Sequence, residues 1–228
     1  MPRYDYVLFD ADNTLFDFDR SEQAAIRLAL ERRGYPTDPE TIGLYLAINQ
    51  ALWSRFNRGE IAQRDLVVER FALFCRVMGR QDDPAAFNRE YLELLAEQSI
   101  LLPGAEELCR ALAPHCQLAI ITNGMSVAQR GRFDRSPLRE IVPRLFISEE
   151  LVVSKPDPAY FSAVFRQMGI TRPERALVVG DNLLTDIRGG QNAGTDTAWY
   201  NPRRLPGGAI RPTWQLEDLQ QLLPIVLG

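Results

Sequence analysis

The chain has 228 residues, of which 46% are apolar, and its formal net charge at pH 7 is -4. This length and apolar content suit one large domain, or a domain with an insertion, built around a buried core. The acidic balance excludes the basic footprint that a binder of nucleic-acid backbones usually carries.

Five short apolar runs have the composition of strands, and helical patterns separate them. The runs cover residues 4–10 (YDYVLFD), 117–122 (QLAIIT), 144–148 (RLFIS), 175–181 (RALVVGD) and 195–200 (TDTAWY). Nearly continuous apolar strands that alternate with helices are typical of a parallel sheet covered on both faces. The sequence therefore predicts an α/β fold with a Rossmann-like parallel sheet core. We expect the tail to be a loop up to Trp214, followed by a final helix.

An all-helical insert interrupts this pattern after the first strand. Residues 19–98 contain almost no strand signal, and we expect helices over about 21–33, 39–59 and 61–78 and from Pro84 onward. The pairs Asp38-Pro39 and Asp83-Pro84 mark helix starts, because Asp caps a helix and Pro suits its first position. We therefore expect two domains: residues 1–18 with 99–228 as the α/β core, and residues 19–98 as an inserted helical domain.

The chain shows no sign of export or of membrane insertion. No leading apolar segment precedes Tyr4, and no run approaches the length of about 18 apolar residues that a spanning helix needs. The three cysteines have no C-x-x-C spacing and are expected to be reduced thiols. We therefore expect a cytoplasmic protein without a membrane partner. The basic residues are scattered, as in RGRFDRSPLR (130–139), and we expect most of them on the solvated surface.

Polar residues stand at the end of each of the first four predicted strands. They are Asp10 and Asp12 after the first strand, Thr122 and Asn123 after the second, Lys155 in the loop past the third, and Asp181 and Asp186 after the fourth. In an open parallel sheet, ligands bind beyond the carboxyl ends of the strands. We therefore expect these side chains to gather in one crevice.

Four aspartates would then converge with only Lys155 as a nearby cation. Carboxylates at close range cannot all stay ionised without more positive charge, and a divalent cation supplies it. All candidate ligands are oxygens, which favours a hard ion, and Mg²⁺ commonly takes one or two carboxylates together with a substrate phosphate. The sequence therefore predicts a Mg²⁺ site that also attracts a phosphate.

These groups could carry out a phosphoryl transfer. Asp10 would attack phosphorus and form an aspartyl-phosphate, while Asp12 would first protonate the leaving oxygen and then activate water. The Thr122 hydroxyl, the backbone N–H groups of Asn123 and Gly124, and the Lys155 ammonium would bind the phosphate. Taken singly, these residues could instead have structural roles: Asp10 and Asp12 could form a turn, Thr122 could be a core residue, Lys155 could lie on a loop surface, and Asp186 could charge a helix start.

Four motifs in this order resemble the signature of the haloacid dehalogenase-like hydrolase superfamily. They are DADNT, ITNG, SKP and VGDNLLTD, and they span Asp10 to Asp186. The resemblance implies that Asp10 is the nucleophile and Asp12 the acid/base. It also implies that Asp10, the backbone carbonyl of Asp12, and Asp181 hold Mg²⁺, with Asp186 as an outer partner that can orient Lys155. The helical insert matches the C1 cap of the superfamily. Asn13 stands where many members have Gly.

A closer resemblance covers nearly the whole chain. The stretches DADNTLFDFD, NQALWSRFNRGEI, LLPGAEEL, IITNGM, ISEELVVSKPDP and IRPTW look like those of bacterial house-cleaning pyrimidine 5′-nucleotidases, which are noncanonical nucleoside monophosphate phosphatases. This implies that UMP, dUMP, dTMP and noncanonical analogues are substrates. The alternatives are a phosphatase of other small phosphates such as sugar phosphates, a phosphomutase, a 2-haloacid dehalogenase and a non-catalytic phosphate-binding regulator. Asp12 argues against the dehalogenase, and the intact acidic and lysine positions argue against the regulator.

Three residues of the insert are candidates for contact with the substrate base. Asn49, Trp53 and Phe56 are four and then three residues apart, which places them on one face of a helix. Aromatic side chains on such a face could stack on a base. A stripe at this spacing is also what a core-facing helix shows, and the sequence leaves both interpretations open.

Overall fold

The structure is a computed structural model that describes residues 2–228. The chain divides into two compact units. One unit consists of the described residues up to Phe18 together with Ser99–Gly228, and the other of Asp19–Gln98. The first unit carries the sheet, and the second is entirely helical.

The sheet of the first unit has six parallel strands within the described residues, in the order β3-β2-β1-β4-β5-β6. The strands are β1 (Tyr6–Phe9), β2 (Gln117–Thr122), β3 (Arg144–Ile147), β4 (Ala176–Gly180), β5 (Asp196–Tyr200) and β6 (Trp214–Leu216). β1 is therefore central, between β2 and β4. The predicted α/β fold with a parallel sheet is confirmed.

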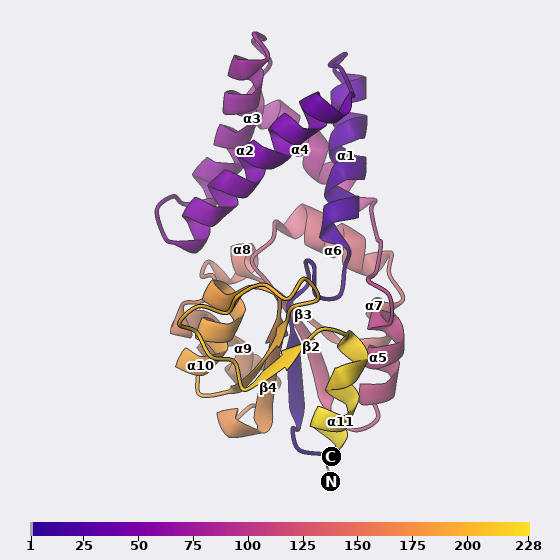
Figure 1. Cartoon of the computed structure of the whole chain (residues 1–228), viewed down its shortest axis with the longest axis vertical. Helices are drawn as coiled ribbons and strands as arrows, with labels where there is room; N and C mark the ends of the chain where they lie inside the picture. Colours follow the sequence, from indigo (N-terminus) through magenta and orange to yellow (C-terminus); the bar gives the residue numbers. More distant parts are fainter. Residues whose placement is uncertain (1) are drawn as a thin grey trace. The chain divides into compact units, whose positions relative to one another are not determined.

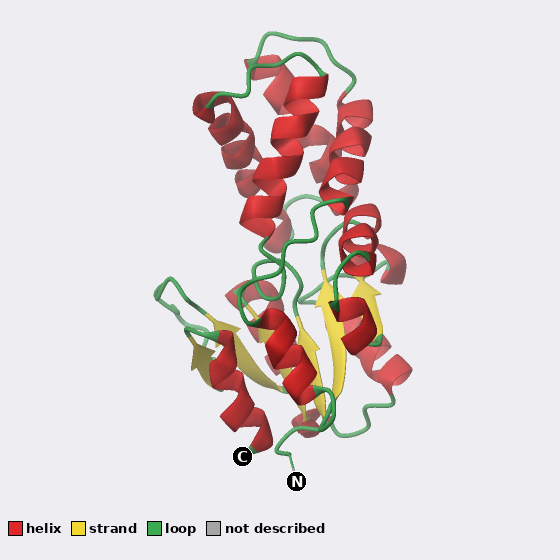
Figure 2. Cartoon of the chain, turned by 90° about the vertical axis from the view of Figure 1, so that its right-hand side faces the viewer, coloured by secondary structure: helices red, strands yellow, loops and turns green. Residues whose placement is uncertain are grey.

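Helices cover both faces of this sheet because its strands are apolar on both sides. Val7 and Phe9 of β1 pack in one buried cluster with residues of α5 (Ala105–Leu112) and α11 (Leu222–Leu227). Leu8, which points to the other face, packs in a second cluster with residues of α9 (Pro158–Met168). Figure 1 shows α9 and α10 on one side of the strands and α5 and α11 on the other, and Figure 2 shows the same layers with the strands in yellow.

The remaining helices of this unit are short, and all except η3, which follows β6, connect successive strands along the chain. They are α6 (Ser126–Asp134), α7 (Leu138–Ile141), α8 (Ser148–Leu151), α10 (Arg188–Asn192), the 3-10 turns η1 (Pro173–Arg175) and η3 (Leu219–Gln221), and the π-helical turn η2 (Leu183–Ile187). η2 follows β4 directly, where the sequence predicted the start of an ordinary helix. Local π-helical turns are frequent at functional sites.

The direction in which successive strands are added to the sheet reverses between β1 and β4, and this switch point determines where the site lies. The chain places β2 and β3 on one side of β1 and then crosses to place β4, β5 and β6 on the other. In an open parallel sheet, the loops that leave adjacent strands on opposite sides of such a switch point open a crevice. The crevice between the carboxyl ends of β1 and β4 is therefore where the fold itself provides room for a ligand.

The helical unit contains α1 (Phe18–Arg32, from Asp19), α2 (Pro39–Asn57), α3 (Gln63–Val77) and α4 (Pro84–Ala96). The predicted N-caps are present: the Asp38 carboxylate accepts the Thr41 N–H at 2.9 Å, and that of Asp83 accepts the Ala85 N–H at 2.9 Å. Its core is aromatic, and the rings of Phe71 and Phe87 are stacked with centroids 4.3 Å apart. The expected helices are therefore all formed, with ends that differ by a few residues.

The prediction for the C-terminal tail was wrong. Residues from Trp214 begin with the strand β6 rather than a helix, and the final helix α11 starts only at Leu222. β6 pairs with β5 in parallel and buries Leu216. Three residues are too few for an alternating pattern, and the strand exists because β5 offers it an edge.

None of the helices among residues 2–228 has both the length and the apolar character that crossing a membrane requires. Cys75, Cys109 and Cys116 are free and buried. His115, the one histidine of the sequence, lies in an exposed turn before β2.

The aromatic core predicts how the helical unit responds to truncation. Phe71 is fully buried, so Phe71→Ala should remove its packing and leave a cavity that costs about 3–5 kcal/mol of unfolding free energy. Urea unfolding followed by circular dichroism measures this. Val77→Ala, at the end of the same helix where Val77 is 62% exposed, should change stability by less than about 0.5 kcal/mol. Equal effects of the two variants would contradict this packing.

Candidate active site

Asp10 lies at the carboxyl end of the central strand. Its backbone N–H donates to the Val179 carbonyl of β4 at 2.8 Å, so the pairing of β1 with β4 continues as far as this residue. The residue is only 8% exposed. Its Oδ1 accepts a hydrogen bond from Lys155 Nζ at 2.6 Å. The apolar strand β1 thus places a carboxylate at the carboxyl end of the sheet, where it pairs with a buried ammonium.

Lys155 is the buried cation of this site. Its Nζ donates to Asp10 Oδ1, to Asp186 Oδ1 at 2.7 Å and to the Ile121 carbonyl at 2.8 Å. Burial alone would lower the pKa of Lys155, but the carboxylates of Asp10 and Asp186 outweigh it and raise that pKa above its ordinary value. Lys155 is therefore a fixed ammonium that ties the ends of β1, β2 and η2 together.

The backbone of Lys155 is held by Asn123. The Asn123 Oδ1 accepts the Lys155 N–H at 2.9 Å, and its Nδ2 donates to the Lys155 carbonyl at 2.8 Å. The peptide bond between Lys155 and Pro156 is cis. The sequence predicted that Asn123 binds phosphate through its backbone N–H. The structure adds a second role for its side chain, which holds the backbone of Lys155 in place.

Asp186 reaches the site because Gly180 has no side chain. A Cβ at Gly180 would lie 2.3 Å from Asp186 Oδ2, so any larger residue there would displace the carboxylate. The Asp186 Oδ2 also accepts the Asn182 N–H at 3.1 Å, and Asp186 is 1% exposed. The expected association of Asp186 with Lys155 is present as a direct hydrogen bond.

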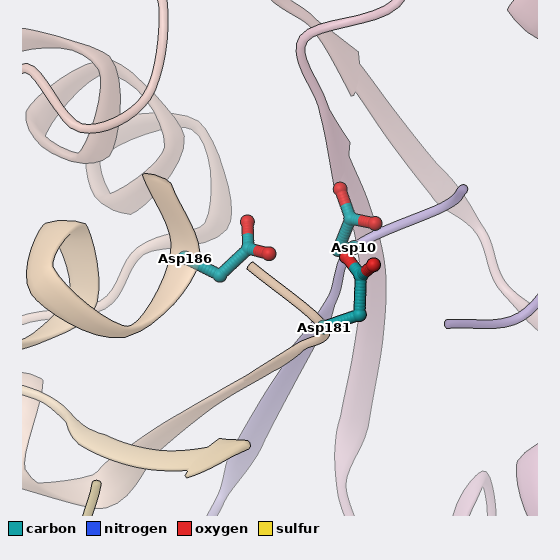
Figure 3. Close-up of side chains that lie close together, drawn as sticks. All are labelled: Asp10, Asp181 and Asp186. Atoms are coloured by element: carbon teal, nitrogen blue, oxygen red, sulfur yellow. The ribbon is translucent and has the colours of Figure 1, made fainter. Parts of the chain in front are cut away.

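Asp10, Asp181 and Asp186 form an acidic cluster in the crevice. One carboxylate oxygen of each lies within 4.8 Å of those of the others, and Figure 3 shows the three side chains converging from β1, from the end of β4 and from η2. Burial, with additions from Asp186 and Asp12, raises the pKa of Asp10 to about 7 although Lys155 opposes the shift. Burial and the carboxylates of Asp10 and Asp186 likewise raise the pKa of Asp181 well above its ordinary value.

This donor set fits a divalent cation. The buried carboxylates of Asp10 and Asp186 and that of the half-buried Asp181 face one ammonium, and desolvation together with the neighbouring carboxylates raises the pKa of Asp10 and of Asp181. The ligand atoms are all oxygens, which suits a hard ion such as Mg²⁺. The structure thus brings together Asp10, Asp181, Asp186 and Lys155, as their positions at strand ends led us to expect.

The segment after β2 differs in part from the expected phosphate cradle. Thr122 is buried at the end of β2, and its Oγ1 accepts the Gly124 N–H at 3.0 Å. The Gly124 N–H, which we expected to face an anion, is therefore already bonded within the loop. The Ser126 N–H at the start of α6 is also engaged, because it donates to Glu149 Oε2 at 2.7 Å. Thr122 directly follows Ile121, whose carbonyl accepts the Lys155 ammonium.

Asp12 is bound by two residues of α6 that sequence reasoning missed. Arg132 Nη1 donates to its Oδ1 at 2.6 Å, and Gln129 Nε2 donates to its Oδ2 at 2.7 Å. Arg132 belongs to the stretch RGRFDRSPLR, most of whose basic residues we expected on the surface. The other three arginines of this stretch are exposed, and Arg132 is the exception, because its side chain is fully buried. The spacing of Gln129 and Arg132, three apart on the helix that follows ITNG, is the signal that points to one shared face.

Asn13 adopts a backbone conformation that explains its position in the first motif. Its φ is 58°, in the left-handed region that favours glycine and that asparagine tolerates better than most residues. Its Oδ1 accepts the Phe18 N–H at 3.1 Å. The turn after Asp12 therefore keeps its shape with Asn in place of Gly.

The three candidate residues of the insert have different surroundings within the helical unit. Asn49 is 2% exposed; its Nδ2 donates to Glu22 Oε1 at 2.5 Å, and its Oδ1 accepts from Arg70 Nη1 at 3.1 Å. Both ends of this amide thus serve the packing of the unit itself, which does not support a contact with a substrate base. Trp53 and Phe56 are half-buried and meet edge to face at 5.4 Å.

Comparison with known proteins identifies the class to which this fold and site belong. A sequence model of the haloacid dehalogenase-like hydrolases matches residues 4–194. The chain therefore belongs to this hydrolase family, and both the predicted resemblance and the predicted hydrolase class are confirmed.

Three relatives match nearly the full length. The pyrimidine 5′-nucleotidase YjjG of Escherichia coli is 37% identical over 97% of this chain and 98% of its own. The pyrimidine 5′-nucleotidase PynA of Streptococcus pneumoniae is 35% identical over 96% of this chain and 94% of its own. The crystal structure of the HAD-hydrolase YfnB of Bacillus subtilis, bound to magnesium and described as revealing interdomain movement, is 36% identical, covers 98% of each chain and has a TM-score of 0.93.

The raised pKa of Asp10 predicts a pH-dependent stability in the absence of divalent cations. Between about pH 4 and 7 the folded protein keeps a proton on Asp10 that the unfolded chain releases, so this group's contribution to stability is lost as the pH rises through that window. Asp10→Asn removes the titration. In EDTA, the melting temperature of the variant relative to wild type should therefore rise from pH 4.5 to pH 8 by about 3 °C or more. Parallel pH curves for the two proteins would contradict the shift.

Proposed function

We propose that the protein is a Mg²⁺-dependent phosphomonoester hydrolase that works through an aspartyl-phosphate on Asp10. The observation that carries this proposal is the surroundings of Asp10. A carboxylate at the switch point of the sheet is hydrogen-bonded to the buried Lys155 and lies with Asp181 and Asp186 in an all-oxygen cluster. A nucleophile, a fixed cation and a set of metal ligands in one crevice are the groups that phosphoryl transfer needs.

Asp10 and Asp12 divide the work between them. In the first step an Asp10 oxygen bonds to phosphorus while the bond from phosphorus to the ester oxygen breaks, and Asp12 gives a proton to the departing alkoxide. In the second step a water molecule transfers a proton to Asp12 as it attacks phosphorus, which releases phosphate and restores the Asp10 carboxylate. Lys155 holds Asp10 in place through its 2.6 Å hydrogen bond and balances negative charge on the transferring group. Thr122 and Asn123 would bind the phosphate oxygens from the end of β2.

Asp10, Asp181 and the backbone carbonyl of Asp12 would hold the Mg²⁺ ion, with Asp186 as an outer partner that also orients Lys155. Mg²⁺ supplies positive charge that keeps the carboxylates ionised and attracts and polarises the phosphate. The need for this charge follows from the cluster itself, in which burial raises the pKa of Asp10 and Asp181. The crystal structure of YfnB with magnesium supports the choice of ion.

Pyrimidine nucleoside 5′-monophosphates are the proposed substrates, including UMP, dUMP, dTMP and noncanonical analogues. The full-length similarity to two proteins named pyrimidine 5′-nucleotidases supports this choice. The helical unit Asp19–Gln98 is proposed to act as the cap that selects the leaving group. Within it, Trp53 and Phe56 are the residues to test for contact with the base, because they are half-buried aromatics rather than members of the core.

The test is a substrate panel with purified protein, Mg²⁺ and release of inorganic phosphate as the readout. UMP, dUMP and dTMP should be hydrolysed with a higher kcat/KM than sugar phosphates and purine monophosphates, and a 2-haloacid, for which halide release is the readout, should not react. EDTA should abolish the activity and Mg²⁺ should restore it. Asp10→Asn should lower kcat/KM by at least about a thousandfold, because it removes the nucleophile.

The matched control is Asp83→Asn, which makes the same exchange at the N-cap of α4, where Asn caps as well as Asp. It should retain wild-type activity. Turnover by Asp10→Asn at the wild-type rate, full activity in chelator, or no turnover of any phosphomonoester would each refute the proposed mechanism. A clear preference for sugar phosphates would be consistent with the proposed mechanism but would refute pyrimidine nucleotides as the substrates.

A further inference from the structure

The contacts of Asp12 assign distinct surroundings to its two carboxylate oxygens. Oδ1 receives a charged hydrogen bond from Arg132 Nη1 at 2.6 Å, and Oδ2 receives a neutral one from Gln129 Nε2 at 2.7 Å. Both donors come from α6, three residues apart. The Asp12 side chain is 26% exposed, whereas that of Arg132 is 0% exposed. The Asp12 carboxylate is thus partly open to solvent, while the guanidinium that holds it is buried.

Arg132 depends on Asp12 for the compensation of its charge. Its guanidinium lies over the rings of Phe16 and Phe18, at 4.8 and 5.6 Å from their centroids. Among the described residues, its Nε and Nη2 atoms have no hydrogen-bond partner. A buried cation that loses its paired anion is strongly destabilising, so a full departure of Asp12 from Arg132 is disfavoured. Oδ1 is therefore the anchored oxygen.

Gln129 is the weaker and replaceable partner. A hydrogen bond from a neutral amide contributes less than one from a guanidinium, so Oδ2 is the oxygen that can exchange its partner for a substrate or a water molecule. The Gln129 side chain reaches Asp12 by passing over Gly124, where a Cβ would lie 2.1 Å from Nε2. The glycine of ITNG thus provides the room that this arrangement needs.

We propose that Arg132 and Gln129 are positioning residues for proton transfer by Asp12, with Oδ1 fixed by Arg132 and Oδ2 left to carry the proton. This inference rests on the proposed function, in which Asp12 is the acid/base. The proton on Oδ2 passes to the leaving alkoxide as its bond to phosphorus breaks. When water attacks the aspartyl-phosphate, its proton returns to Oδ2. Arg132 and Gln129 touch neither substrate nor phosphorus and act only through the direction of the Asp12 carboxyl group.

The arrangement is anchored to the chain segments on both sides of the helical unit. The rings that cover Arg132 belong to Phe16 and Phe18, in the segment that precedes that unit, and the Arg132 carbonyl accepts the Ser99 hydroxyl at 2.8 Å, in the segment that follows it. All four residues belong to the sheet-bearing unit. A rigid base of this kind is what a positioning residue needs in order to hold a carboxylate in one orientation.

The test compares two esters that differ in their need for a proton. UMP releases an alkoxide that requires protonation, whereas p-nitrophenyl phosphate releases a stable phenolate that does not. For both, kcat/KM reports the steps up to departure of the leaving group. Arg132→Met should lower kcat/KM for UMP about a hundredfold and that for p-nitrophenyl phosphate by less than about fivefold, because only the first reaction loses general acid catalysis. Gln129→Met, which keeps the volume and removes the donor, should lower the UMP value about tenfold and spare the aryl ester.

Arg130→Met is the matched control, because Arg130 lies on the same helix, is exposed and pairs with Glu150 instead. It should leave both values unchanged. Circular dichroism melting establishes whether each variant is folded. If Arg132→Met does not fold, the comparison of the two esters is made with Gln129→Met alone. Equal losses on both esters, or no loss on either, would overturn the inference while Asp10→Asn still abolishes activity on both. If wild type hydrolyses neither ester, the proposed function itself fails and the inference falls with it.

Discussion

The buried ammonium of Lys155 is the interaction on which the rest of the site depends. It is 2% exposed and donates to Asp10, to Asp186 and to the Ile121 carbonyl. Three strand ends meet at this one nitrogen, because Asp10 follows β1, Ile121 is in β2, and Asp186 follows β4. Removing a partner of a buried charge costs far more than removing one from an exposed pair. The ammonium therefore fixes the geometry of the carboxylates before any ligand arrives.

The topology of the sheet explains why these groups meet where they do. β1 lies at the point where the strand order reverses, so the loops that follow β1 and β4 leave on opposite sides and open a crevice between them. Asp10 directly follows β1 and Asp181 directly follows β4, so the two residues lie on opposite sides of that crevice. Gly180, at the end of β4, lets Asp186 approach within a distance that no other residue would allow. One ammonium cannot balance three carboxylates, and the excess negative charge suits this cluster to a divalent cation.

Features that depend on local pattern could be predicted from the sequence, and those that depend on distant contacts could not. The apolar runs identified β1 to β5, because strands buried on both faces carry continuous hydrophobic residues. Asp10, Lys155, Asp181 and Asp186 could be gathered into one site because each follows a strand of the same sheet. β6 was missed, since its three residues become a strand only beside β5. Burial of Arg132 was also missed.

The burial of Arg132 has a physical cause that no local pattern carries. In the sequence it is one of two arginines on a short helix, and the other, Arg130, is exposed and paired with Glu150. What distinguishes Arg132 is the carboxylate of Asp12, which lies 120 residues away in the chain. Asn49 shows the converse. Its helical spacing from Trp53 and Phe56 suggested that it faces the substrate, but its side chain makes buried polar contacts with Glu22 and Arg70. Spacing identifies a shared helix face but not what that face meets.

The proposed mechanism depends on Asp10 as the residue that takes up the phosphoryl group. The most direct measurement is acid quenching of the enzyme during turnover of a phosphomonoester with Mg²⁺, followed by proteolysis and mass spectrometry of the peptide that contains Asp10. We expect a transient phosphoryl group on Asp10, and none on any residue of the Asp10→Asn variant. A phosphoryl group on another residue, or turnover by the Asp10→Asn variant at the wild-type rate, would contradict it.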